Sequence, residues 1–263
     1  MGRVHTLVNQ KGGVGKTTTA INLGAYLAQF GQRVLIIDID PQANATSSLG
    51  VDKHAVKGGT YDVLLGETPA TSLVLQNPRL KLAILPSSPS LAGAEVELVN
   101  ELGRESKLKQ AIMTLEERYD YILIDCPPSL GLLTVNGLMA AKDGVLIPVQ
   151  CEYLALEGLG DLTRTIQRVR QAIFPSLKVR GVILTMFDGR THLSQDVVAE
   201  VRKYFSEKVF ETIIPRSVRL AEAPSYGLPV SVYAPGSSAA KAYEMLAREL
   251  LKSDGVVISE SVE

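Results

Sequence analysis

The chain has 263 residues, of which 46% are hydrophobic and 21% charged, and its formal net charge is -1. This composition is typical of one folded domain with a large core, and it excludes a disordered or fibrous chain. The charge excludes a polycation, so any contact with nucleic acid has to come from a local basic patch. The apolar runs, such as 34–37 and 145–149, are far shorter than the roughly 20 residues that cross a bilayer.

We expect a cytoplasmic protein with reduced cysteines and no membrane span. An apolar strand begins within a few residues of Met1, which leaves no room for the regions of a signal sequence. Cys126 and Cys151 are far apart in the sequence and lack the CxxC spacing of redox and metal sites. Free thiols stay reduced in the cytoplasm, so both are expected as thiols at the ends of apolar strands.

Apolar strands alternate with helical patterns along the chain. Strands are expected at 3–8, 33–38, 81–85, 121–125, 145–149, 179–185 and 210–214. Helices are expected at 18–30, 61–65, 91–118 with a break near Gly103, 156–173, 194–205 and 239–251. The pattern predicts an α/β fold, namely a doubly wound, mostly parallel sheet with helices on both faces. We expect strand 121–125 to neighbour strand 3–8 in this sheet.

The chain shows no internal repeat and no linker rich in proline, glycine or serine. Residues 1–252 are therefore expected to form a single domain around one core. Residues 253–263 are polar and acidic, and we expect them to form a flexible tail.

The segment from Asn9 to Thr19 lies between the first strand and the first helix and has the composition of a phosphate-binding loop. Its glycines allow backbone N–H groups to converge on phosphate oxygens, and the following helix directs its positive dipole end to the same place. Lys16 can reach the terminal phosphates, and the Thr17 hydroxyl can ligate the Mg²⁺ that they carry. The expected nucleotide-binding residues of this loop are Lys11, Gly12, Gly13, Val14, Gly15, Lys16, Thr17 and Thr18. A glycine-rich turn without a ligand is the alternative, and the order of strand, loop and helix disfavours it.

Three aspartates follow two of the predicted strands. Asp38 and Asp40 come at the end of the second strand, and Asp125 ends strand 121–125. In an open α/β sheet, the carboxyl ends of the strands form the edge where ligands bind. Because Mg²⁺ sheds its water reluctantly, Asp38 and Asp125 are expected near the ion through water, with Thr17 as a direct ligand. The alternative is that Asp38 and Asp40 are caps at the end of a strand.

The phosphate loop departs from the general GxxxxGK[ST] pattern, because Gln10 stands where the first glycine would be and Lys11 follows it. KGGVGKT is the deviant Walker A motif, and with it the sequence resembles the ParA/MinD group of nucleotide-switch ATPases, which are P-loop NTPases. The resemblance implies that Lys11 crosses to the nucleotide of a facing subunit, so that ATP is sandwiched in an ATP-dependent homodimer. It also implies that Lys11, Lys16 and Asp40 are catalytic, Asp40 by positioning the attacking water, and that Gly12 lies against its own copy in the partner. A solvated loop lysine is the alternative for Lys11.

A second motif, IPRSVRLAEAPSYG at 214–227, resembles the IPRxxRLxEAPSxG pattern of the partitioning branch, the ParA/Soj type. By this resemblance Pro215 and Ser217 lie near the adenine, although family members often carry Asn in place of Ser217. Arg190 and Arg219 match arginines that form a nonspecific double-stranded DNA surface in chromosomal ParA-like proteins. The alternatives are an ordinary turn for the first pair and solvated arginines for the second.

The sequence therefore resembles ParA/Soj-type partitioning ATPases over nearly its whole length. Such an enzyme uses ATP and Mg²⁺ and associates with the nucleoid, and a ParB/Spo0J-type centromere-binding protein stimulates the slow hydrolysis that releases it from DNA. A MinD-like ATPase that holds a membrane is the first alternative, but segment 250–263 is acidic and broken by a glycine, unlike a basic amphipathic anchor. A redox relative with a metal cluster is the second, and it requires Cys126 and Cys151 as ligands at a dimer axis.

Overall fold

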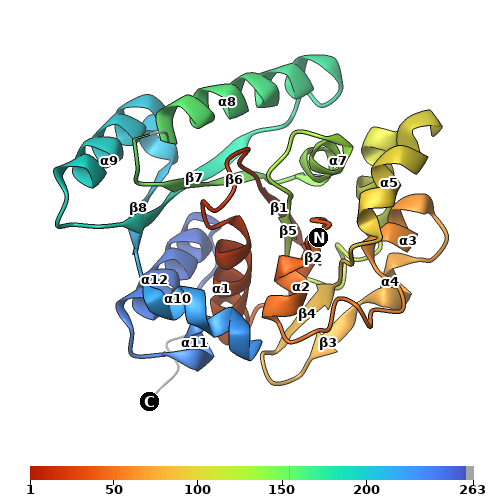
Figure 1. The fold of residues 1–263 in the computed structure, drawn as a ribbon, viewed down its shortest axis with the longest axis horizontal. Coiled ribbons are helices and arrows are strands. Elements are labelled where there is room, and N and C mark those ends of the chain that lie inside the picture. Colours follow the sequence, from red (N-terminus) through yellow and green to blue (C-terminus); the bar gives the residue numbers. More distant parts are fainter. Residues whose placement is uncertain (154, 259–263) are drawn as a thin grey trace.

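An eight-stranded sheet runs through the centre of the structure, a computed structural model that describes residues 1–153 and 155–258 (Figure 1). In spatial order the strands are β3 (Leu75–Asn77), β4 (Leu82–Leu85), β2 (Val34–Asp38), β5 (Tyr121–Asp125), β1 (Arg3–Leu7), β6 (Gly144–Gln150), β7 (Val179–Phe187) and β8 (Val209–Pro215). Neighbouring strands are parallel except for the edge pair of β3 and β4, which is antiparallel. The predicted mostly parallel sheet is confirmed.

Helices cover both faces of the sheet, as predicted. They are α1 (Lys16–Gln29), α2 (Asn44–Ser48), α3 (Thr60–Leu65), α4 (Ala70–Leu73), α5 (Leu91–Glu97), α6 (Lys107–Ile112), α7 (Leu132–Ala140), α8 (Ala155–Ala172), α9 (His192–Phe205), α10 (Val218–Glu222), α11 (Val230–Tyr233) and α12 (Ser238–Ser253). Short 3₁₀ turns are η1 (Leu98–Asn100), η2 (Arg104–Ser106), η3 (Ser206–Lys208) and η4 (Ala223–Tyr226). Buried side chains of α1 and α12 share one apolar cluster below the sheet, and those of α8 and α9 share another above it (Figure 1).

Side-chain caps explain where two of the predicted helices begin. Thr191 Oγ1 accepts a hydrogen bond from Ser194 N at 3.3 Å before α9, and Ser237 Oγ accepts one from Ala240 N at 3.2 Å before α12. Each cap satisfies an N–H group that has no partner within the first helical turn. Both helices therefore start slightly earlier than their apolar pattern indicates.

Three features of the chain differ from the expected elements. Strand β5 pairs with β1, as expected, and also with β2, so it separates the two strands of the first crossover. The edge strand β3 and the helix α7 were not predicted; α7 is buried along most of its length and lacks the polar face that reveals a helix in a sequence. Segment 91–118 breaks at Gly103, as expected, but its last helix ends at Ile112.

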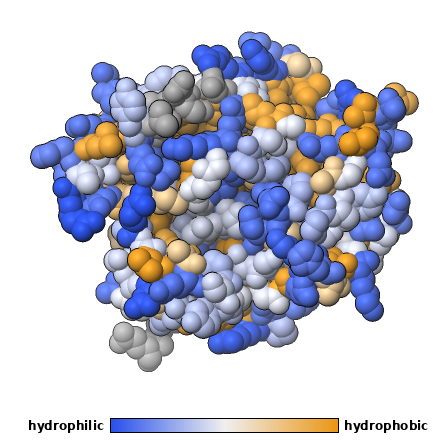
Figure 2. All heavy atoms as spheres, viewed as in Figure 1, coloured by the Kyte–Doolittle hydropathy of each residue, from blue (hydrophilic) through white to orange (hydrophobic). Residues whose placement is uncertain are grey.

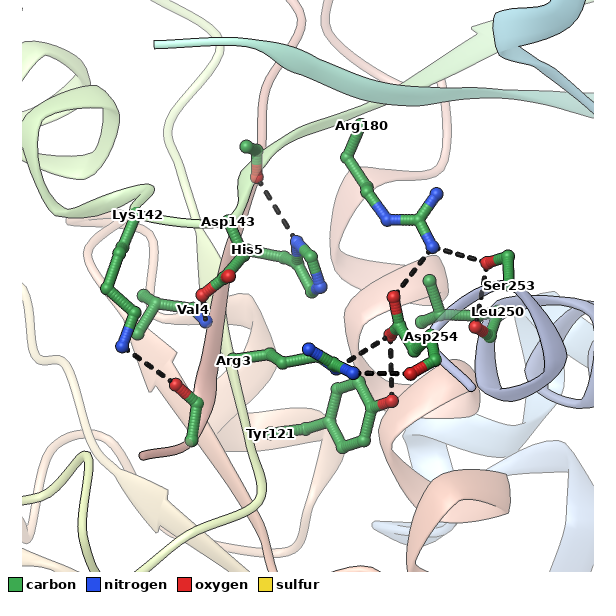
Figure 3. A network of polar contacts seen from close by, with 12 residues as sticks. Arg3, Val4, His5, Tyr121, Lys142, Asp143, Arg180, Leu250, Ser253 and Asp254 are labelled. Atoms are coloured by element: carbon green, nitrogen blue, oxygen red, sulfur yellow. Dashed lines mark hydrogen bonds and ion pairs between the residues drawn. The ribbon is translucent and has the colours of Figure 1, made fainter. Parts of the chain in front are cut away.

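Asp254 anchors the end of α12 at the amino edge of the sheet (Figure 3). Its carboxylate accepts hydrogen bonds from the Tyr121 hydroxyl and from Arg180 Nη2, both at 2.8 Å, and pairs with Arg3 Nε at 3.2 Å. These three partners come from β5, β7 and β1. Asp254, which lies within the predicted tail of residues 253–263, is thus in contact with two guanidinium groups and a phenol, and the flexibility of that tail stays a prediction. Residues 259–263 of that tail lie outside the described residues.

The face of the molecule in Figure 2 is mostly hydrophilic, and its apolar side chains form small patches. Exposed apolar residues include Val96, Val99 and Leu102, on α5 and just after it. Cys126 and Cys151 are free thiols buried at the ends of β5 and β6, as expected. None of the helices in the described part of the chain is long and apolar enough to cross a membrane.

Candidate nucleotide-binding site

The loop between β1 and α1 is held in place by side chains near the ends of neighbouring strands. Asn9 Oδ1 accepts a hydrogen bond from Lys11 N at 3.0 Å, and Asn9 Nδ2 donates to a backbone carbonyl of β6 at 2.8 Å. Thr185 Oγ1 donates to Val14 O at 2.8 Å. These bonds fix the loop before any ligand arrives. The sequence did not reveal the role of Thr185, although a polar residue near the end of an otherwise apolar strand was a signal.

A cavity of about 360 Å³ opens in front of this loop. Its walls are formed by Gly12, Gly13, Gly15, Lys16, Thr17, Thr18, Asp40, Asn44, Ser48, Pro128, Met186 and Pro224. Six of the eight residues predicted in the loop line this one cavity. Of the other two, Val14 is buried behind the loop and Lys11 faces a different cavity. We call this space the phosphate cavity.

Lys16 and Thr17 bring a positive charge and a hydroxyl group to the phosphate cavity. Lys16 is largely buried, and its ammonium group lies 3.3 Å from Lys11 O. Burial lowers the pKa of Lys16, while the nearby carboxylate of Asp125 opposes that shift. Thr17 Oγ1 donates to Asp125 Oδ2 at 2.6 Å. The structure thus brings together the lysine, the hydroxyl and one of the carboxylates that the sequence predicted.

Asp38 and Asp125 lie opposite each other on β2 and β5, and both are fully buried. Burial raises the pKa of Asp38 to about 6, although hydrogen bonds from Thr46 favour its charged form. Burial also raises the pKa of Asp125 well above its usual range, and the charge of Asp38 adds to that effect. Asp125 Oδ1 has no hydrogen-bond partner among the described residues. An unpaired carboxylate oxygen beside the Thr17 hydroxyl is a donor set that suits Mg²⁺.

Thr46 ties Asp38 to the start of α2. Both its N–H and its hydroxyl donate to Asp38 Oδ2 at 2.8 Å, and Asp40 N donates to Asp38 Oδ1 at 3.1 Å. Thr46 Oγ1 also accepts a hydrogen bond from Ser87 N at 2.9 Å. Since both oxygens of Asp38 already have protein donors, its approach to a metal ion through water stays a prediction.

Asp40 is placed where it can face a phosphate. It lies in the wall of the phosphate cavity, is 5% exposed, and accepts a hydrogen bond from Gln42 N at 2.9 Å through Oδ1. The carbonyl oxygen of Asp40 accepts another from Ser87 Oγ at 2.8 Å. These bonds orient the side chain, and its role toward an attacking water stays a prediction.

A second cavity, of about 220 Å³, continues from the phosphate cavity past Thr18, which lines both. Pro215 and Ser217 line this base-side cavity, so both lie where an adenine contact requires them, and that contact stays a prediction. Tyr243 of α12 lines it too, and its hydroxyl lies 3.1 Å from Thr19 Oγ1. The sequence did not reveal Tyr243, because it lies on the closing helix far from either motif.

Lys11 is not among the residues that line the phosphate cavity, although its carbonyl oxygen accepts a hydrogen bond from the Lys16 ammonium group. It lines a third cavity, of about 540 Å³, whose wall includes Glu152, Asp188 and Arg216. Among the residues that the structure describes, no carboxylate lies within ion-pair distance of the Lys11 ammonium group. Glu152 is paired with Arg216 at 2.7 Å. The predicted contact of Lys11 with the nucleotide of a facing subunit stays a prediction.

Arg190 and Arg219 are exposed shortly after the neighbouring strands β7 and β8. The Arg190 guanidinium pairs with Asp188 at 2.7 Å, and that of Arg219 pairs with Glu222 at 2.8 Å. Hydrogen bonds from Arg190 lower the pKa of Asp188 to about 2. The side chains of the two arginines are 88% and 58% exposed, so both are accessible to a polyanion. Each carries an acidic neighbour, and the predicted contact with DNA stays a prediction.

Known proteins resemble this chain along nearly their whole length. A family model described as an AAA domain matches residues 2–179. The chromosome partitioning protein ParA of Myxococcus xanthus is 52% identical, covering 97% of this chain and 89% of that protein. The sporulation initiation inhibitor protein Soj of Bacillus subtilis is 51% identical, covering 95% of this chain and 98% of that protein. The crystal structure of cobyrinic acid a,c-diamide synthase from Mycobacterium smegmatis, with a bound ATP analogue and magnesium, has a TM-score of 0.85 and 39% identity, covering 97% of this chain and 96% of that one.

Proposed function

This chain belongs to the ParA/Soj family of chromosome-partitioning ATPases, and from that premise we propose that it is an ATP-driven switch for DNA segregation. ATP joins two copies into a sandwich dimer that holds double-stranded DNA without sequence preference. Slow hydrolysis, stimulated by a ParB/Spo0J-type centromere-binding protein, separates the dimer and releases the DNA. The protein then cycles on and off the nucleoid.

The position of Lys11 is the observation that carries this proposal. Lys16 already supplies a positive charge to the phosphate cavity, while Lys11 lies outside that cavity and has no carboxylate partner among the described residues. A lysine in this position can reach the nucleotide of a facing subunit. Lysines of both subunits then contact the negative phosphates of each ATP, so that subunit association depends on the nucleotide.

Gly12 supports the same arrangement. A Cβ atom at this position would meet its nearest neighbour, the Pro128 Cβ, at 3.9 Å, which is ordinary van der Waals contact. The subunit itself therefore has room for a side chain at position 12. In the proposed dimer, a side chain at position 12 would instead meet the facing copy of the chain.

Hydrolysis relies on groups already present in the phosphate cavity. Mg²⁺, when bound, neutralises phosphate charge, and Thr17 and Asp125 are the residues that would hold it. Lys16 stabilises negative charge on the terminal phosphates. Asp40, which lines the same cavity, orients the attacking water.

DNA holding requires several positive groups on one surface, and the dimer would double those of each subunit. Arg190 and Arg219 are exposed and follow neighbouring strands at the edge of the sheet that carries the nucleotide. Contacts between arginine and phosphate release counterions, so binding should weaken as salt rises. Each arginine can exchange its acidic neighbour for a phosphate without a change of fold.

The test is duplex-DNA binding by the wild type and by Asp40→Ala, without nucleotide, with ADP and with ATP, at two salt concentrations. We expect binding only with ATP, weaker binding at higher salt, and persistent binding by the hydrolysis-impaired variant. Absence of DNA binding in every condition, together with ATP-dependent attachment to anionic liposomes, would replace this function with that of a MinD-like ATPase.

A further inference from the structure

Residues 215–227, which we call the belt, run along both parts of the nucleotide site. Pro215 and Ser217 at the start of the belt line the base-side cavity. Pro224 near its end lines the phosphate cavity, as do Asn44 and Ser48 of α2. Between these points, α10 presents Arg219 to solvent. One continuous segment therefore touches the nucleotide site in two places and carries a proposed DNA contact between them.

The belt ends in a close contact between two backbones. A Cβ atom built on Gly227 would lie 2.7 Å from Gly50 Cα and 3.0 Å from Gly50 N, closer than real side chains come to a backbone. Gly227 has a φ of 64°, and Gly50 has a φ of 80°, so both adopt the left-handed conformation. No side chain lies between them to absorb a displacement. When one of two backbones in such close contact is displaced, either the other backbone moves with it or the contact opens.

Gly50 belongs to the turn that closes α2, and α2 lines the phosphate cavity through Asn44 and Ser48. Gly50 N donates to Ser47 O at 3.0 Å, which holds it to the last turn of the helix. Thr46 of the same helix donates twice to Asp38. A change in the phosphate cavity can thus reach Gly50 through the five-residue helix α2.

We propose that the contact between Gly50 and Gly227 couples the phosphate end of the nucleotide site to the DNA surface on α10. Loss of the terminal phosphate shifts α2, the contact passes that shift to the belt, and the belt moves Arg219. The inference rests on the proposed DNA-holding function and names the path by which hydrolysis would release DNA. It assigns Gly227 a positioning role that is distinct from any contact with nucleotide or DNA.

Three glycine-to-alanine variants separate this contact from ordinary backbone strain. Gly227→Ala introduces a Cβ that collides with the backbone of Gly50. Gly50→Ala imposes the same left-handed strain at the same junction, but its Cβ would be 3.7 Å from the nearest atom, an ordinary distance. Gly31→Ala, at a φ of 81° beyond the end of α1, has nothing within 4 Å and reports strain alone.

DNA affinity is measured for the wild type and the three variants at saturating ATP, with ATP affinity measured alongside. We expect Gly227→Ala to lose about tenfold in DNA affinity, within the usual range of coupling between two sites, while Gly50→Ala and Gly31→Ala stay close to the wild type. Equal DNA affinity of Gly227→Ala and Gly50→Ala would overturn the coupling. A wild type that does not bind DNA with ATP would instead overturn the proposed function, so the two failures are distinguishable.

Hydrogen exchange in the wild type keeps the proposal testable if Gly227→Ala does not fold. Amides of 44–50 and of 218–227 are compared between the ADP state and the ATP state. We expect both segments to change protection together, while 107–112 in α6, remote from the contact, stays unchanged. A change in 44–50 with none in 218–227 would overturn the coupling.

Discussion

The two edges of the sheet treat buried charge in opposite ways. At the carboxyl edge, Asp38 and Asp125 are buried side by side with raised pKa values, and Asp125 Oδ1 lacks a hydrogen-bond partner among the described residues. At the amino edge, Asp254 is held by two guanidinium groups and a phenol (Figure 3). The carboxyl edge has carboxylate charge that a bound cation can neutralise. At the amino edge, arginines of the chain itself neutralise the charge of the carboxylate.

This difference distinguishes acidic residues that bind a ligand from acidic residues that stabilise the fold. A buried acid without a partner is costly, so it persists only where something else supplies the compensating charge. A buried acid with two cationic partners tolerates burial without a ligand. Substitutions at the carboxyl edge should therefore change catalysis, and those at the amino edge should change unfolding.

The largest effect is expected from Lys16→Gln at the carboxyl edge. This change removes the positive charge nearest the phosphates, so kcat should fall by about 10²–10³, as when a preorganised charge is lost from other active sites. Phosphate release with Mg²⁺ and ATP measures it. Lys241→Gln, an exposed lysine on α12, is the matched control and should hydrolyse ATP at the wild-type rate. An active Lys16→Gln enzyme would contradict the assignment of the phosphate cavity.

Asp254→Ala tests the amino edge. It leaves Arg3 and Arg180 without their shared partner, and we expect the free energy of unfolding to drop by about 3 kcal/mol. Urea denaturation measures the loss. Glu244→Ala removes an exposed ion pair from the same helix and should cost less than about 1 kcal/mol. Equal losses in the two variants would show that the amino-edge network does not hold the fold.

The raised pKa of Asp38 predicts a pH dependence of the apo protein. The folded pKa of about 6 lies above the ordinary value of about 3.9, so between these limits the folded state binds a proton that the unfolded chain has lost. Stability therefore falls as pH rises through this window and levels off above it. Relative to Asp38→Asn, the wild type should lose about 2 kcal/mol between pH 4 and pH 7 in urea unfolding without nucleotide or Mg²⁺. A constant difference would contradict the raised pKa.

The smallest effect is expected from Arg219→Ala, an exposed arginine on the side of the sheet that carries the nucleotide. Its loss should weaken DNA binding and reduce the slope of log affinity against log salt by about 1 for each subunit. Arg33→Ala is the control, because Arg33 pairs with Asp120 at nearly the same exposure but at the amino end of β2. Unchanged affinity and salt slope for Arg219→Ala would remove this residue from the DNA surface.

The sequence predicted the parts of the molecule in which a local pattern decides the structure. The apolar run before Asp38 and the glycines before Lys16 fixed a strand and a phosphate loop, and six loop residues do line one cavity. Thr185 and Tyr243 were not predicted, because each reaches the loop or its helix through contacts across more than 150 positions. The anchor at Asp254 was missed for the same reason. An acidic residue near the end of a chain resembles a frayed tail until its distant partners are known.

The most direct test of the central claim is the mass of the protein in solution with ATP, measured by light scattering. In the hydrolysis-impaired Asp40→Ala background, we expect a dimer with ATP and a monomer with ADP. Adding Gly12→Val should preserve ATP binding and abolish the dimer, because a Cβ at this position meets nothing closer than 3.9 Å within the subunit, whereas in the proposed sandwich the side chain would meet the facing copy. An ATP-dependent dimer of the Gly12→Val variant would contradict the sandwich arrangement.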